Sequence, residues 1–325
     1  MRRLATFLLT VFVLMPLSAQ DWGLNWISAP WQSDTDQVWF SRGFSLSAKP
    51  GKARVEVASS GHFQLFINEL NVTTRLLEPF AQQGEDTLHV VSYDVKPFLR
   101  QGFNSLRVWF SPTCSSPKQL SLTLVAEMGR RWFALTTDGS WLCTYAHART
   151  FADGHEEVDG RYHIKKPASV ALWQPAKEQK NVSPSFRMAD FIGKTPYEVR
   201  SFTCSMMEAD TTQSRVCTYR CGLAFEGRVS VSLTGMKAGD TLRVNRHVYV
   251  CNGRDGEQAL QRFAIGESGT VRIEGPARFS ANNVDLVEAI LIRPLAELGA
   301  RPFPAGHLSA YDDEPIVFLD EHDDD

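Results

Sequence analysis

The sequence has little excess of basic charge, and this scarcity excludes one class of partner. It carries 34 Lys and Arg against 37 Asp and Glu, which gives a formal net charge of −3 at pH 7. Eight of the acids fall within residues 312–325, so 34 basic residues stand against 29 acidic ones in the rest of the chain. Nucleic-acid binding needs a concentrated basic face that displaces counterions from phosphates. We therefore expect no nucleic-acid partner.

Familiar catalytic and metal-binding motifs are also missing. The sequence has no Gly-x-Ser-x-Gly nucleophile turn and no glycine-rich phosphate loop that ends in Lys. Its eight histidines lack metal-ligand spacing, and no Cys-x-x-Cys pair accompanies them. We therefore predict no cofactor and no zinc site.

Only one long apolar run occurs, and it lies at the N-terminus. Two arginines precede an uncharged stretch from Leu4 to Ala19, which is short for a membrane span of about 20 residues. This pattern is typical of a secretory signal peptide that is cut near Ala19. Because the first cysteine is Cys114, the sequence excludes a lipid anchor on an N-terminal cysteine. We expect residues 1–19 to be removed, and the mature protein to be periplasmic or secreted and to have no membrane span.

Export would permit disulfide bonds among the six cysteines. Cys217 and Cys221 lie on one expected strand, where four residues separate them by about 13 Å, too far for a bridge between them. A bridge from either one would go to Cys204 or Cys251 on a neighbouring strand. Buried free thiols are an equally open alternative, because cysteine is among the most buried residues.

Alternation of polar and apolar residues is the dominant pattern, and it predicts an all-β protein. A period of two over such short runs is typical of half-buried antiparallel strands. Turn signals containing glycine or proline separate the runs, and no segment keeps helical periodicity beyond a couple of turns. The alternating runs are residues 54–58, 63–67, 105–110 and 120–125, then 228–233, 241–244 and 270–274.

The chain divides at a stretch rich in proline and lysine between Trp173 and Pro196, which indicates an extended connection. We expect two antiparallel β-sandwich domains in tandem, followed by an acidic and partly disordered tail. The boundaries that we predict are a first sandwich at 20–176, a linker at 177–196, a second sandwich at 197–294 and the tail at 295–325.

Several short motifs in the first half follow one another in a characteristic order. In that order they resemble the N-terminal jelly-roll domain of bacterial α-L-rhamnosidases, and residues 227–288 resemble the β-sandwich that follows it in those enzymes. The resemblance implies two jelly-roll, or galactose-binding-like, sandwiches. The motifs that carry it are Trp26–Pro30, Val38–Phe44, Gly61–Asn68, Tyr93–Leu99, Thr137–Trp141 and Asp153–Arg161.

The same resemblance bears on catalysis. Rhamnosidases carry their acid and base carboxylates in an (α/α)6 barrel after the second sandwich, and the segment after Arg293 is too short to build one. Glycoside hydrolysis needs two carboxyl groups about 5 Å apart for retention or about 6.5–9.5 Å apart for inversion. On an extended segment Glu157 and Asp159 would share one face about 7 Å apart. The simpler interpretation is that these carboxylates bind Arg161 or loop amides, and we expect no rhamnosidase activity.

Sugar binding is the function that remains, since it needs an aromatic face and a few convergent polar groups. The resemblance implies a sugar site on a jelly roll, with calcium as a structural or ligand-bridging ion. The loops at 78–84, 111–117 and 282–286 depart from the family pattern, so that site cannot be transferred residue by residue. The candidate ligand-binding residues are Trp22, Trp26, Trp31, Asp153, Glu156, Asp159 and Arg161.

Three functions stay open. The first is an exported, non-catalytic carbohydrate-binding or accessory protein related to α-L-rhamnosidases, which acts in the breakdown of plant-type or rhamnose-containing glycans. The second is a structural or protein-interaction module of the cell envelope. The third is a rhamnosidase-like hydrolase that works only with a separate catalytic chain. The corresponding partners are a glycan, an envelope protein or a hydrolase, and the sequence names neither the sugar nor the oligomeric state.

Overall fold

The structure is a computed structural model in which the described residues form strands, turns and two short 3₁₀ segments, with no α-helix among them. This confirms the all-β prediction. The expected signal peptide, Trp22 and the expected acidic tail lie outside the described residues. The described residues are 25–31, 33–73, 77–78, 88–112, 119–162, 172–179, 186–188, 197–209 and 215–294.

The first sheet has seven strands, in the order β13-β1-β8-β3-β6-β14, with β9 paired to β8. All its pairs are antiparallel except β14 with β6. Its strands are β1 (Trp26–Ser28), β3 (Lys52–Ser59), β6 (Leu88–Asp94), β8 (Leu120–Met128), β9 (Arg131–Thr136), β13 (Lys177–Gln179) and β14 (Phe186–Met188).

The second sheet connects fifteen strands, in the order β15-β22-β17-β21-β18-β19-β11-β10-β2-β7-β4-β5, with β12, β16 and β20 as side branches. The strands from the first half of the chain are β2 (Asp36–Leu46), β4 (His62–Ile67), β5 (Leu70–Asn71), β7 (Gly102–Ser111), β10 (Leu142–Thr150), β11 (Glu156–Asp159) and β12 (Gln174–Pro175). Those from the second half are β15 (Tyr197–Thr203), β16 (Ser205–Ala209), β17 (Val216–Leu233), β18 (Thr241–Val244), β19 (His247–Val250), β20 (Glu257–Leu260), β21 (Gly266–Glu274) and β22 (Val284–Pro294). The 3₁₀ segments are η1 (Lys96–Phe98) and η3 (Ala281–Asn283).

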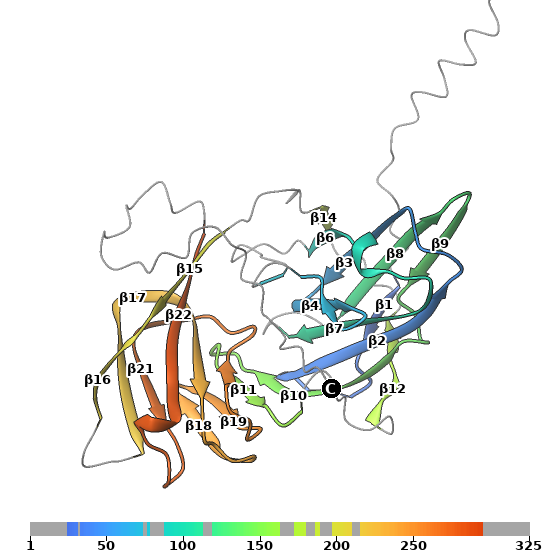
Figure 1. The fold of residues 1–325 in the computed structure, drawn as a ribbon. Coiled ribbons are helices and arrows are strands. Elements are labelled where there is room, and N and C mark those ends of the chain that lie inside the picture. The colour runs from blue at the N-terminus through green and yellow to red at the C-terminus, as the bar shows by residue number, and fades with distance from the viewer. Residues whose placement is uncertain are drawn as a thin grey trace, which may run out of the picture.

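Two hydrophobic cores explain this arrangement. In the first, side chains of β3 and β8 meet those of β2, β4 and β7, and Trp141 is fully buried among them. In the second, side chains of β17, β18, β21 and β22 pack together. Alternate residues of each strand enter a core, as the period of two requires. We call these bodies the first and second sandwich, and Figure 1 shows them as two lobes.

The segment expected to be an extended linker contains two short paired strands. Lys177–Gln179 forms β13 on β1, and Phe186–Met188 forms β14 on β6. Both segments add to edges of the seven-stranded sheet, where their backbone groups find hydrogen-bond partners. The domain boundaries themselves stay a prediction.

The cysteines divide into one disulfide and buried thiols. Cys204 is bonded to Cys221, which is one of the partners considered from the sequence. Cys143, Cys217 and Cys251 are buried and free. Burial raises the pKa of Cys143 to about 12, so its thiol stays protonated and unreactive at neutral pH.

The part of the chain that the structure describes contains no helix long and apolar enough to cross a membrane.

Candidate ligand-binding site

The strand β11 joins the two sandwiches. It pairs antiparallel with β10 of the first sandwich and parallel with β19 of the second. Glu157, for example, lies opposite Arg149 on one side and Val248 on the other. The segment Asp153–Arg161, which the sequence marked as a candidate, therefore lies at the junction (Figure 1).

Glu156 holds this junction together. Its side chain is buried, with Oε1 accepting a hydrogen bond from Gln37 Nε2 at 2.6 Å. Its Oε2 accepts from the backbone N–H groups of Arg262 at 2.8 Å and Phe263 at 3.4 Å. Burial raises the pKa of Glu156, against the opposing effects of the Gln37 amide and the Arg228 charge. Its carboxyl group thus serves the protein interior rather than an open cleft.

Asp159 and Arg161 form the ion pair that the sequence suggested. Arg161 Nε lies 2.9 Å from Asp159 Oδ1, and Nη2 lies 2.7 Å from Oδ2. The Arg161 side chain is 48% exposed, so solvent weakens the pair. Because both oxygens of Asp159 face Arg161, the geometry favours an anchor for the segment over a catalytic carboxylate.

The other predicted ligand residues lie apart from one another. Asp153 is exposed, and its carboxylate lies 2.6 Å from Nδ1 of His155. Trp26 is fully buried, and Trp31 is partly buried against the first core. Since Trp26 has no exposed face, stacking on a sugar would require it to move. The ligand-binding role of all seven residues stays a prediction.

An aromatic cluster also lies at the junction, and it includes Trp39, which the sequence suggested as a residue of the first core. Trp39 and Trp109 are opposite each other on β2 and β7, with ring centroids 4.9 Å apart. Phe263 of the second sandwich covers Trp109 edge-on at 5.7 Å, which leaves Trp109 6% exposed. These aromatic groups therefore pack the two sandwiches together.

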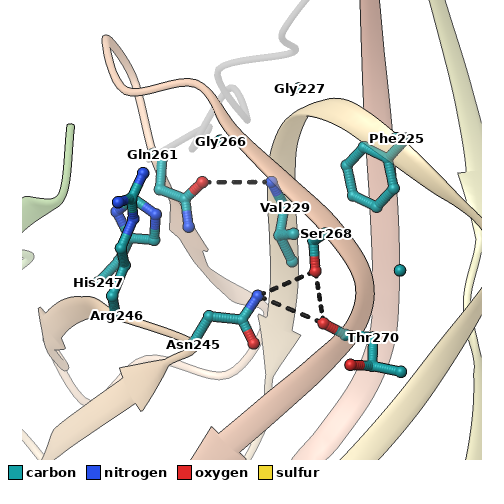
Figure 2. A pocket seen from close by; sticks show the side chains of 11 residues that line it. Phe225, Gly227, Val229, Asn245, Arg246, His247, Gln261, Gly266, Ser268 and Thr270 are labelled. Carbon is teal, nitrogen blue, oxygen red and sulfur yellow. Dashed lines mark hydrogen bonds between the residues drawn. The ribbon is translucent and has the colours of Figure 1, made fainter. Parts of the chain in front are cut away.

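A pocket of about 390 Å³ opens in the second sandwich next to this junction (Figure 2). It lies between β17, the β18–β19 turn and the start of β21. Such a volume is near the lower end of the about 300–1,000 Å³ typical of small-molecule sites. The side chains that the following paragraphs use are Phe225, Asn245, Arg246, His247, Gln261 and Ser268.

Asn245 fixes the floor of this pocket. It has a left-handed backbone conformation, with φ of 52°, in the two-residue turn between β18 and β19. Asparagine tolerates this conformation better than most residues, and it is common in such hairpin turns. Its Nδ2 donates to Ser268 Oγ at 3.2 Å, and its Oδ1 accepts from the backbone N–H of Arg272 at 2.8 Å. These bonds hold the turn against β21.

Gln261 and His247 bring hydrogen-bond donors to the pocket. Gln261 is 7% exposed; its Oε1 accepts from Val229 N–H at 3.4 Å, and its Nε2 makes no hydrogen bond to a described residue. Figure 2 shows this amide nitrogen pointing into the pocket. His247 is 8% exposed, and its Nδ1 accepts from the backbone N–H of Glu156 at 3.0 Å. Burial, aided by the Arg246 charge, lowers the pKa of His247 to about 4. The neutral ring therefore carries its proton on Nε2.

Arg246 supplies a positive charge at the rim of the pocket. Its side chain is exposed and forms no ion pair with a described residue. Its Nη2 lies against Gly154 and Gly266, where an added Cβ would approach to 3.3 and 3.2 Å. Asp153, whose carboxyl pKa the Arg246 charge helps to lower, is already bonded to His155. Arg246 thus stays available to an anionic ligand.

The calcium site expected from the sequence would need a group of ligand atoms that lie close together. Among the described residues no three His, Cys, Asp or Glu side chains gather as metal ligands would. Calcium also binds backbone carbonyl groups, so the calcium expectation stays a prediction.

The comparison with protein families shows what the first sandwich resembles. The family model of the α-L-rhamnosidase N-terminal domain matches residues 48–186. Those residues are therefore similar to the α-L-rhamnosidase N-terminal domain. The matched range includes the junction segment Asp153–Arg161, whereas the pocket residues lie beyond it. A search of the curated proteins finds no significant match.

Solved rhamnosidases extend the likeness to both sandwiches. The α-L-rhamnosidase from Dictyoglumus thermophilum aligns with a TM-score of 0.71 at 18% identity, over 85% of this chain and 36% of that one. The enzyme from Aspergillus terreus gives 0.69 at 16%, over 86% and 37%. The Streptomyces avermitilis enzyme, solved with L-rhamnose, gives 0.68 at 16%, over 82% and 30%. The chain thus spans about a third of the length of these rhamnosidases, and the likeness shows a shared fold.

Proposed function

We propose that the chain is an exported, non-catalytic carbohydrate-binding or accessory protein that acts in the breakdown of plant-type or rhamnose-containing glycans. The observation that carries this proposal is the pocket in Figure 2, where buried Gln261 and His247 bring unused donors to one cavity. Convergent polar groups suit the hydroxyl groups of a sugar. The likeness of the first sandwich to the α-L-rhamnosidase N-terminal domain supplies the glycan context.

The state of two carboxylates supports binding without cleavage. Cleavage needs two carboxyl groups that face each other across a glycosidic bond. Glu156 is buried and accepts three hydrogen bonds, and Asp159 is held by Arg161. Neither group is placed to protonate a leaving oxygen.

Export rests on the N-terminal sequence pattern and on the Cys204–Cys221 disulfide. Disulfides persist in oxidising compartments, such as the bacterial periplasm and the extracellular space. Both observations support a periplasmic or secreted location.

A protein-interaction role is the second candidate, and one observation favours it. Trp132 is 68% exposed on β9, which pairs only with β8 among the described strands. An open strand edge beside an exposed tryptophan suits addition of a partner strand. A Trp132→Ala variant that loses an envelope or hydrolase partner, but keeps its glycans, would support this role.

A glycan array with the mature protein tests the proposal. We expect binding to a subset of glycans that is reduced by Arg246→Ala. Repeating the array in calcium and in a chelator tests the expected calcium. An array without any bound glycan under both conditions would refute the carbohydrate-binding function.

A further inference from the structure

The charge and donor pattern of the pocket in Figure 2 selects a chemical class of ligand. Three side chains from two segments bring N–H groups without partners among the described residues to this pocket: Arg246 and His247 from the β18–β19 hairpin, and Gln261 from the segment after β20. Two side-chain amide oxygens at the pocket are already bonded, because Asn245 Oδ1 accepts from the N–H of Arg272 and Gln261 Oε1 accepts from that of Val229. The Asp153 carboxylate near Arg246 is bonded to His155. A site that offers donors and one positive charge calls for a ligand rich in acceptors, with one negative charge.

A carboxylate meets this requirement better than a phosphate group does. A phosphate carries close to two negative charges and three strong acceptor oxygens, and it is commonly bound by clusters of arginines. Here a single guanidinium is joined by two neutral donors, because His247 is uncharged with Nδ1 bonded to Glu156. One cation with two neutral donors matches the single charge of a carboxylate.

The rest of the pocket calls for more than a carboxylate. Its volume of about 390 Å³ far exceeds one carboxyl group. Ser268 Oγ, which accepts a hydrogen bond from Asn245 Nδ2, and the exposed Thr270 lie along one wall. Hydroxyl groups beside the donors suit the polar edge of a sugar.

We propose that this pocket binds an acidic sugar, a uronate unit of a glycan, with Arg246 as the counter-ion of its carboxylate and Gln261 and His247 as neutral donors. This inference rests on the proposed carbohydrate-binding function and names its ligand class. It places the site in the second sandwich, whereas the residues suggested by sequence lie in the first.

Pairs of matched ligands provide the test. Calorimetric titration of the mature full-length protein would compare methyl α-galacturonoside with methyl α-galactoside, and methyl α-glucuronoside with methyl α-glucoside. Within each pair the sugars differ only at C6, where the acidic member has a carboxylate and the neutral member a hydroxymethyl group. We expect at least one acidic member to bind more tightly than its neutral partner, and less tightly as ionic strength rises. Acetate, which carries the carboxylate without the sugar, should not compete at the same concentration.

Variants locate the site. Arg246→Ala should weaken binding of the acidic sugar by about tenfold or more, because it removes a charged hydrogen bond. The matched control is Arg243→Ala, an exposed arginine of the same hairpin that does not line the pocket, and it should leave binding unchanged. Gln261→Glu keeps the acceptor for Val229 N–H but replaces the free donor with a carboxylate oxygen, so it should abolish binding.

Each failure has a separate meaning. Equal binding of acidic and neutral sugars, full competition by acetate, or wild-type affinity in Arg246→Ala would overturn the uronate site. Any of these results combined with glycan binding on the array would leave the proposed function standing. Loss of all binding, on the array and in titration, would remove both.

Discussion

Replacing Glu156 with alanine should destabilise the protein strongly, because this side chain bonds to both sandwiches. Glu156 is 1% exposed, and it binds Gln37 from β2 and the backbone N–H groups of Arg262 and Phe263 from the second sandwich. The variant would leave those three donors without an acceptor. It would also remove the carboxyl group that interacts electrostatically with Arg228. Removing one partner from such a buried charged network costs about 3–5 kcal/mol.

The matched control is Arg161→Ala, five residues along the same segment. The Arg161 side chain is 48% exposed, and its pair with Asp159 lies in solvent. An exposed ion pair of this kind contributes about 0–1 kcal/mol. Urea unfolding of both variants, followed by tryptophan fluorescence, measures the difference. Equal losses of stability in the two variants would refute the view that Glu156 holds the junction.

Three further outcomes follow from the structure. The pKa of His247 is lowered to about 4, against 6.5 for an ordinary histidine, so the unfolded chain binds more protons than the folded one between these two pH values. The free energy of unfolding should therefore fall by about 3 kcal/mol as the pH drops from 6.5 to 4. Urea unfolding across this range should show a weaker pH dependence in His247→Gln, and identical curves would contradict the assignment. Replacing Cys204 and Cys221 together with serine should cost about 3 kcal/mol, measured against the wild type with and without a reductant. Purified protein should release no rhamnose from an aryl α-L-rhamnoside, and any trace activity should survive Glu157→Gln combined with Asp159→Asn; activity that this double change abolishes would make the segment catalytic.

The sequence predicted strands best where alternate apolar side chains enter the first core. The alternating run 54–58 lies within β3, and 120–125 lies within β8. The long strand β17 was divided into two expected pieces, because its register with β21 shifts between Arg220 and Phe225 and interrupts the alternation. The segment of β11 was expected to be extended, but Glu-Glu-Val-Asp is too polar and too short to predict which strands it pairs with. Its place is set by the strands on either side.

The pocket could not be predicted for a related reason. Its donors come from a hairpin turn and from a segment after β20, and only the antiparallel pairing of distant strands brings them together. The one local signal was Asn245, an asparagine between two alternating runs, and it marks a turn without revealing what the turn faces. Burial of Gln261 and the tautomer of His247 depend on contacts more than 10 residues away in sequence.

The motif Asp153–Arg161 gains a different meaning from the structure than its carboxylates suggest. Glu156 orients His247 through its backbone N–H, and Gly154 leaves room for the guanidinium of Arg246. A side chain at Gly154 would crowd that guanidinium, and its φ of 77° also disfavours any other residue. The first sandwich therefore shapes a pocket that lies in the neighbouring sandwich. Because the same segment joins the sandwiches and supports the pocket, changes that loosen the junction should weaken ligand binding as well.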